Sequence, residues 1–239
     1  MEDFSLHGGI DAAALAEEFA RAKRVTIAPF LAEEQALALH ALLQTRDDWR
    51  QMMNSGPDKV FELDRATRAG FTPERRAAID EVVYAGARND FQFRYESVRV
   101  PDEDAARAAS DDPLFAFARF MSSGPARDLL RTVVGDAQIA FADAQATAFS
   151  PGDFLTRHHD HVPGKNRIAA YVFSLNPVWR IEWGGLLLMH HLGDEHGADA
   201  LVPGFNRLNL FAVPQYHSVS EVSRAAHCAR YSVTGWLRR

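Results

Sequence analysis

The chain has 239 residues and a mass of 26.6 kDa, enough for one sizeable hydrophobic core. Its hydrophobic and charged fractions, 47% and 24%, are ordinary for a globular protein. The formal charge of −6 argues against a nucleic acid or an anionic membrane surface as the main partner. The single cysteine, Cys228, excludes an internal disulfide framework and suits a reducing compartment. Acidic residues at the N-terminus do not fit a signal peptide, and no apolar run is long enough to span a membrane, so we expect a cytoplasmic protein.

The first part of the chain is predicted to be rich in helices. Apolar residues recur at helical spacing in four segments: 10–22, 32–44, 73–90 and 113–134. The helix over 73–90 begins with a proline, and its spacing turns Ile79, Val82 and Val83 inward. Two shorter segments, 24–31 and 91–100, have the β-branched or alternating pattern of strands.

Two further segments look like loops. Residues 101–112 are acidic, small and polar, which favours a mobile surface loop. Residues 52–72 also lack a clear period. Each segment is a candidate substrate lid, and for each a role as a solvated connector is an equal alternative.

From residue 138 onward the pattern changes to short apolar runs separated by turn residues. These runs are IAFADAQATAF, RIAAYVFSL, GGLLLMHH, ALVP, RLNLFAV, HSVSEV and RYSVTGWL. About seven strands without intervening helices predict a barrel or jelly roll. We therefore expect an α+β fold in a single domain over 1–239, with a helix-rich support (1–137) packed on one face of a barrel core (138–239).

Histidines are the most informative residues. Seven of the ten lie between positions 158 and 217, and the densest cluster is Arg157-His158-His159-Asp160-His161. Alternate residues of a strand share a face, so His158 and Asp160 point the same way, as do His159 and His161. Only the pair of His158 and Asp160 offers a histidine and a carboxylate together. Two histidines and one carboxylate form the arrangement that suits iron(II) and leaves coordination positions open.

The third ligand has to come from a distant strand. His217 is the candidate, because it begins the run HSVSEV after a proline-containing turn. Four other histidines compete for this position: His190, His191, His196 and His227. Histidines in exposed loops are usually surface residues, which favours His217. The histidines and the carboxylate alone predict a metal site only weakly.

Arg230 strengthens the prediction. It begins RYSVTGW, an apolar strand in which a buried arginine is costly unless an anion pairs with it. Its planar fork matches a carboxylate, and Ser232 on the same face offers a hydroxyl donor. A metal site beside a carboxylate clamp indicates a small diacid that also chelates the metal.

The stretch from 149 to 237 resembles the prolyl-hydroxylase branch of the 2-oxoglutarate and iron(II)-dependent dioxygenases. The matching motifs, in order, are FSPGDFLTRHHD, R-IAAYVFSLNPVW, EWGGLLLMH, P-FNRLNLF, HSVSEV and RYSVTGW. The form PGDFL–H–D looks closest to the ribosomal-protein prolyl hydroxylases and their bacterial relatives. The N-terminal helices match only in general character. The resemblance implies a double-stranded β-helix core, with iron(II), 2-oxoglutarate and O₂ as cofactor and cosubstrates and with ascorbate as a further reductant.

By this resemblance His158, Asp160 and His217 match the iron ligands, and Arg230 matches the residue that pairs with the distal carboxylate of 2-oxoglutarate. Thr234 and Trp236 fall where the family lines the pocket near the cosubstrate. Four more residues match a structural turn between two strands: Asn176, Trp179, Gly184 and Gly185. The retained Asp160 argues against a halogenase variant.

The sequence also departs from the family. Phe149 and Ser174 stand where relatives often carry a tyrosine that contacts the cosubstrate. Another donor is then expected to replace that hydroxyl, with Tyr171, Gln145 and Ser232 as candidates.

Alternatives remain for the function. A protein prolyl residue is the favoured substrate by resemblance alone, and a free amino acid or a small peptide is the alternative. A different class, a non-redox metal-binding barrel or an inactive scaffold, would treat His158 and Asp160 as a turn pair and Arg230 as a surface ion-pair partner. The sequence does not indicate an oligomeric state.

Overall fold

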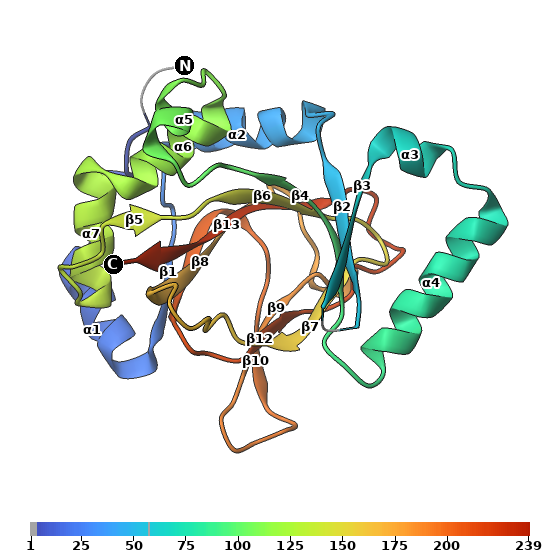
Figure 1. The fold of residues 1–239 in the computed structure, drawn as a ribbon. Coiled ribbons are helices and arrows are strands. Elements are labelled where there is room, and N and C mark those ends of the chain that lie inside the picture. The colour runs from blue at the N-terminus through green and yellow to red at the C-terminus, as the bar shows by residue number, and fades with distance from the viewer. Residues whose placement is uncertain (1–3, 57) are drawn as a thin grey trace.

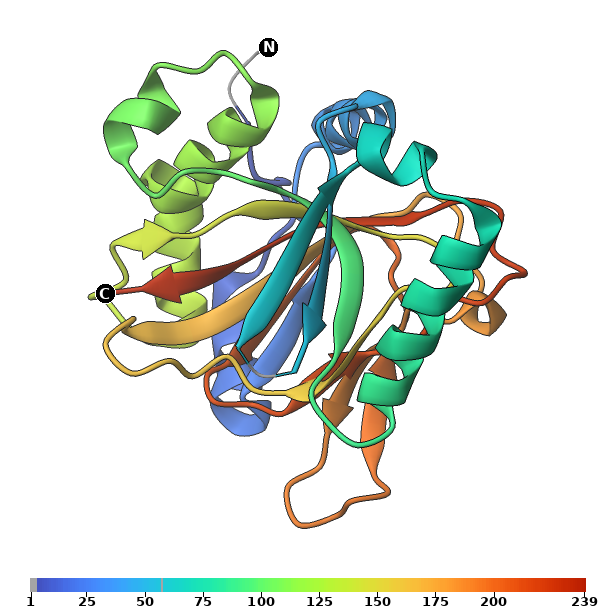
Figure 2. The same cartoon turned by 45° about the vertical axis from the view of Figure 1, so that its right-hand side comes forward.

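The computed structural model describes residues 4–56 and 58–239. A curled antiparallel sheet forms its centre, and helices cover the sheet from outside (Figure 1). Helices α1, α5, α6 and α7 gather on one side of the sheet and α4 stands at the opposite side, with α2 and α3 between them along the top of the view (Figures 1 and 2). This arrangement confirms the predicted jelly-roll core and the α+β class.

Thirteen strands of the described residues join in the sheet. They are β1 (Arg24–Ile27), β2 (Arg50–Ser55), β3 (Lys59–Asp64), β4 (Phe93–Arg99), β5 (Phe141–Ala142), β6 (Gln145–Phe149), β7 (Phe154–His158), β8 (Arg167–Leu175), β9 (Leu187–His190), β10 (Ala198–Leu201), β11 (Phe205–Ala212), β12 (His217–Val219) and β13 (Arg230–Arg238). The main path runs in the order β1-β11-β8-β13-β6-β4-β7-β12-β9-β10, with β2 attached to β4, β3 to β2, and β5 to β13.

The helices follow the sequence signals for starts and stops. They are α1 (Ala12–Ala22), α2 (Glu33–Thr45), α3 (Arg65–Ala69), α4 (Pro73–Ala87), α5 (Asp104–Ala108), α6 (Pro113–Ser122) and α7 (Gly124–Val134), and a 3₁₀ turn covers Ile181–Trp183. Asp11 caps α1 by accepting hydrogen bonds from two backbone N–H groups, and Thr72 caps α4 just before Pro73. Gly135 ends α7 with a φ of 74°, a conformation that glycine adopts without strain.

Aromatic and aliphatic side chains join the helical layer to the sheet. The main core contains Phe117 of α6, which stacks on Phe173 of β8 with ring centroids 5.4 Å apart, and Phe30 packs edge-on against the same ring. Because each buried aromatic side chain removes a large apolar area from water, this cluster anchors β8 at the middle of the sheet.

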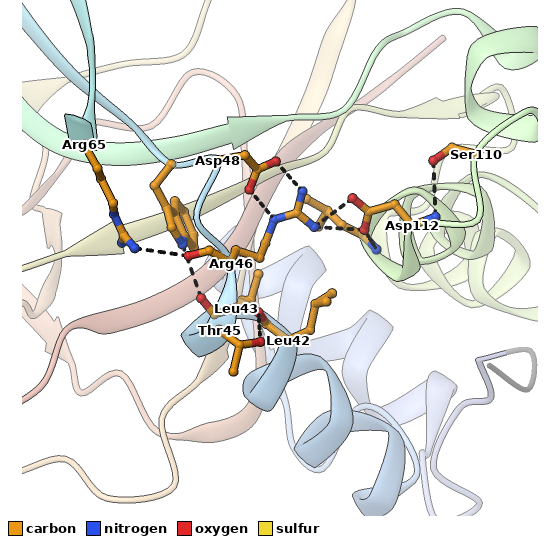
Figure 3. Close-up of polar contacts among 10 residues, drawn as sticks. Leu42, Leu43, Thr45, Arg46, Asp48, Arg65, Ser110 and Asp112 are labelled. Carbon is orange, nitrogen blue, oxygen red and sulfur yellow. Dashed lines mark hydrogen bonds and ion pairs between the residues drawn. The ribbon is translucent and has the colours of Figure 1, made fainter. Parts of the chain in front are cut away.

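A polar cluster at Arg46 joins three elements (Figure 3). At the end of α2, the Arg46 guanidinium donates to both carboxylate oxygens of Asp48, at 2.8 and 2.6 Å, and to both of Asp112, at 2.9 and 2.7 Å. Asp112 is also the N-cap of α6, and Arg65 of α3 donates to the backbone carbonyl of Arg46 at 3.1 Å. The paired geometry fixes the end of α2 against α6 and against the segment that leads to β2, and Arg65 joins α3 to the same point.

Several predictions for the first part of the chain were wrong. Residues 52–72 are not a loop: they form most of the β2–β3 hairpin followed by α3, and residue 57 lies outside the described residues. Residues 101–112 contain α5, whose Arg107 is buried and donates to the carbonyls of Pro101 and Ala142. The helix over 113–134 is divided into α6 and α7 at Ser123. Pairing with a distant strand, which local pattern does not reveal, stabilises the hairpin.

Helix α4 also faces differently from the prediction. Val83 is buried, with 2% of its surface exposed, and packs with Met53 and Phe154, whereas Val82 is 58% exposed. Ile79 lies partly buried beside the same cluster. The described residues contain no helix with the length and apolarity of a membrane span.

The contrast between these two valines is testable. Val83→Ala is expected to lower the free energy of unfolding by about 1–2 kcal/mol, because it leaves a cavity in a packed cluster. Val82→Ala is the matched control on the same helix, and its effect should stay within about 0.5 kcal/mol. Urea unfolding followed by circular dichroism measures both, and equal losses would contradict this orientation of α4.

Candidate metal centre and active site

A cavity of about 230 Å³ lies inside the curled sheet. Residues from β4, β6, β7, β8, β9, β11, β12 and β13 line it, so its wall is assembled from segments far apart in the chain. His158, Asp160, His217 and Arg230 all face this one cavity. The two segments that we considered as substrate lids, 52–72 and 101–112, contribute no described residue to the lining of this cavity.

The three predicted metal ligands meet at one side of the cavity. His158 ends β7 and His217 begins β12, and the two residues are paired across these antiparallel strands. His158 Nε2 lies 3.6 Å from Asp160 Oδ1, and His217 Nε2 lies 3.5 Å from Asp160 Oδ2. The imidazole centroids are 4.2 Å apart. Among the described residues this is the group of three side chains whose ligand atoms are close enough to share a metal ion.

Backbone carbonyls orient both imidazole rings. His158 Nδ1 lies 3.0 Å from the carbonyl oxygen of Thr156, and His217 Nδ1 lies 2.9 Å from that of Gln215. Since a carbonyl can only accept, each Nδ1 carries the proton, and each Nε2 presents its lone pair to the cavity. Burial, followed by the charge of His217, lowers the pKa of His158 to about 4, which keeps this ring neutral near pH 7.

The donor set fits iron(II). Bonds of about 2.1 Å at right angles would bring neighbouring donor atoms to about 3 Å, so small side-chain movements close the observed separations. All three side chains line the same cavity of about 230 Å³. His158, Asp160 and His217 would therefore hold the metal and leave room beside it for a chelating molecule.

The competing histidines have other contacts. His159 packs against Tyr216 with centroids 5.1 Å apart, and His161 lies beyond it. His190 Nε2 lies 2.9 Å from Ser218 Oγ, and His191 Nε2 lies 3.0 Å from a carboxylate oxygen of Asp199. The remaining two candidates also lie apart from the triad: His196 is in the β9–β10 loop, and His227 packs edge-on against Trp183.

Arg230 is a buried cation at the cavity wall. It is 1% exposed, and its Nε and Nη2 atoms have no hydrogen-bond partner among the described residues. The guanidinium carbon lies 5.1 Å from the ring centroid of Phe149, and burial lowers the pKa of Arg230 to about 10, so it is still charged at pH 7. An unpaired charge in such a place is costly, and an anion that enters the cavity would remove that cost.

Two neighbouring structural features hold Arg230 in position. A Cβ atom at Gly185, where φ is +62°, would lie 3.1 Å from Arg230 Cδ, so glycine leaves room for the arginine stem. Asn176 extends the pairing of β8 with β13: its side chain donates to the carbonyl of Tyr231 and accepts from the N–H of that residue. Trp179 Nε1 donates to the carbonyl of Gly184 at 3.0 Å, which holds the predicted turn.

Of the other residues predicted to contact the cosubstrate, some line the cavity and others have hydroxyl groups that are already hydrogen-bonded elsewhere. Thr234 and Trp236 line the cavity, as expected. Ser232 does not line it; instead its hydroxyl lies 2.8 Å from that of Thr147, which does. Tyr171 lines the cavity with its ring, but its hydroxyl donates to the carbonyl of Asp143 at 2.6 Å and is not free for a cosubstrate.

The sequence interpretation missed two residues with hydroxyl groups that line the cavity, Tyr95 and Thr147. Tyr95 of β4 lines the cavity and stacks on Phe149 with centroids 5.1 Å apart, next to Gln145 and Thr147 of β6. Burial raises the pKa of Tyr95, so its phenol stays protonated and can donate. Of the three donors suggested for the missing hydroxyl, only Gln145 has a polar group at the wall. Ser174 is fully buried and does not line the cavity. The alternation Phe91, Phe93, Tyr95 was the one available signal for this wall.

Comparisons with known proteins agree with this geometry. Residues 144–238 match the model of the 2OG-Fe(II) oxygenase superfamily. The fold is similar to a Pseudomonas putida prolyl-4-hydroxylase (18% identity, TM-score 0.62, 96% of this chain and 99% of that one). It is also similar to a Burkholderia pseudomallei oxidoreductase of the 2OG-Fe(II) oxygenase family (13%, 0.60, 98% and 92%). A third similar structure is a Trichoplax adhaerens prolyl hydroxylase in complex with a hypoxia inducible factor peptide (14%, 0.55, 95% and 88%). No curated protein matches the chain.

The assignment of the ligand face predicts opposite results for adjacent histidines. His158→Ala is expected to weaken metal binding by more than about 100-fold, beyond the range typical of residues that only orient a ligand. His159→Ala, the neighbouring control, should bind metal within a few-fold of the wild type. Calorimetric titration with Mn²⁺, a redox-stable substitute for iron(II), measures both. The opposite ranking would place the ligands on the other face of this segment.

Proposed function

We propose that the chain is a 2-oxoglutarate-dependent dioxygenase of the 2OG-Fe(II) oxygenase superfamily, whose model its residues 144–238 match, and that it hydroxylates a carbon atom of a prolyl residue. The observation that carries the 2-oxoglutarate part is Arg230, a buried cation with two unpartnered nitrogen atoms in the cavity of the triad. An inactive scaffold would have no use for such a group. The favoured substrate is a prolyl residue of a protein or peptide.

The chain's own residues divide the work of binding. His158, Asp160 and His217 would hold the iron, and Arg230 would receive the distal carboxylate of 2-oxoglutarate through its planar fork. Iron(II) with 2-oxoglutarate and O₂ supplies the oxidising chemistry that converts a substrate C–H to C–OH and yields succinate and CO₂. The apolar lining limits water around the site, which protects the reaction from side products.

Two observations support a prolyl residue as the substrate. Phe91, Phe93 and Tyr95 form a continuous aromatic row with successive centroids 5.6 Å apart, and Phe91, the exposed end of this row, packs on His158 at 5.4 Å. A flat apolar wall of this kind suits a pyrrolidine ring. In addition, two of the similar structures are prolyl hydroxylases, one of them bound to a peptide.

The role of Arg230 gives a two-sided prediction. Arg230→Leu should leave the protein at least as stable in the absence of ligand, because it removes an uncompensated buried charge. At a 2-oxoglutarate concentration about 100 times the wild-type Kd, with Mn²⁺ present, the wild type should gain about 2.7 kcal/mol of stability and the variant almost none. Thermal unfolding measures this, with the exposed Arg21→Leu of α1 as control. A large ligand-induced shift in the Arg230→Leu variant would contradict the assignment.

Activity is tested in two steps. The iron-loaded enzyme should form succinate from 2-oxoglutarate and O₂ without a prime substrate, and His217→Ala should reduce this turnover to background. After incubation with peptides that contain proline, mass spectrometry should detect a gain of one oxygen atom on a prolyl residue. Succinate without any prolyl oxidation would retain the dioxygenase and reject the proposed substrate.

A further inference from the structure

A second cavity of about 430 Å³ adjoins the first, and we call it the vestibule. Three residues line both cavities: Gln145, Thr234 and Trp236. The other walls of the vestibule come from the end of β4 with residues 100–103, the β5–β6 connection, and the segment that leads into β8. A molecule in the vestibule would therefore lie directly beside the cavity that contains the triad.

Positive groups without an acidic partner face the vestibule. Arg99, Lys165 and Arg167 line it, and none forms an ion pair with a carboxylate among the described residues. Of the acids that line the vestibule, Asp102 and Asp143 share Arg238, at 2.8 and 2.6 Å, and Glu103 is exposed, so three cations and one acid have no ion pair among the described residues. The free charge on the vestibule wall is therefore positive.

Arg167 occupies the innermost position. Its guanidinium carbon lies 3.5 Å from the ring centroid of Trp236, and its Nη1 donates to the backbone carbonyl of the ligand residue Asp160 at 3.0 Å. These two contacts fix the plane of the guanidinium beside the metal centre. Its Nε atom is buried and has no partner, so the fork retains donor capacity.

We propose that Arg167 and Arg99 bind a carboxylate of the prime substrate and so position the carbon that is oxidised beside the metal ligands. This inference rests on the proposed function, since it concerns the substrate of the same reaction. The carboxylate belongs to a free amino acid, to the C-terminal residue of a peptide, or to an acidic side chain beside the oxidised residue. In each case the chemistry of recognition is a charge-assisted pair with a planar guanidinium.

The vestibule is distinct from the position of the cosubstrate. Arg230 and Trp236 are six positions apart on β13, which is roughly 20 Å at about 3.3 Å per residue. A five-carbon diacid anchored at Arg230 does not extend over that length. The two arginine sites therefore serve two different anions.

Matched probe pairs test the inference with the iron-loaded enzyme. The pairs are L-proline and L-prolinamide, Gly-Gly-Pro and its C-terminal amide, and acetylated and amidated peptides with Pro-Asp or Pro-Asn inside. Succinate formed above the turnover without probe gives kcat and KM. In at least one pair we expect the carboxylate form to have a KM lower by about tenfold or more, the effect of one charge-assisted hydrogen bond. The pair that discriminates identifies the source of the carboxylate.

Variants assign the preference to the two arginines. Arg99→Leu and Arg167→Leu should abolish the discrimination mainly through KM, Arg167→Lys should retain part of it, and Arg21→Leu should retain all of it. Arg99→Leu matters most, because Arg99 has no contact with a metal ligand. The inference is overturned if no pair discriminates, or if both leucine variants keep the wild-type preference. Prolyl oxidation that is equal in the Pro-Asp and Pro-Asn peptides, with no preference in the other pairs, would overturn it while leaving prolyl hydroxylation intact.

Discussion

The pairing of β13 with β8 on one side and with β6 on the other is the constraint on which the site depends. This one strand carries Arg230 near its start and Trp236 near its end, and its register sets Arg230 opposite Phe149 and Trp236 opposite Ala170. The metal ligands come from a second pairing, β7 with β12, in which His158 faces His217. Because antiparallel hydrogen bonding fixes register residue by residue, the two arrangements together define a cavity with three candidate metal ligands at one wall and the guanidinium of Arg230 at another.

The sequence was most informative where chemistry and local period agreed. His158 and Asp160 were separated from their neighbours by strand alternation, and Arg230 was singled out because an arginine in an apolar strand demands an anion. Both arguments need only residues within a few positions. The turn at Gly184 and Gly185 was expected from the family resemblance, and both glycines have the positive φ that such a turn requires.

The sequence was least informative where the answer depends on contacts between distant segments. The β2–β3 hairpin exists because β2 pairs with β4, about 40 residues further along the chain, and nothing in residues 52–72 indicates that partner. The hydroxyl of Tyr171 is occupied by the carbonyl of Asp143, and that of Ser232 by Thr147, so residue type alone could not tell a free donor from one already in use. The vestibule also depends on contacts between distant segments, because β4, β6, β8 and β13 each supply part of its wall.

The hydrogen bonds from His158 and His217 to the carbonyls of Thr156 and Gln215 affect how the site would take up a metal ion. They lie within the chain segments that carry the ligands and do not require an ion to form. The loss of conformational entropy that accompanies ring ordering therefore occurs during folding, not during metal uptake. If a bound metal were removed, both imidazole rings would therefore keep their orientation, and rebinding would not require them to be ordered again.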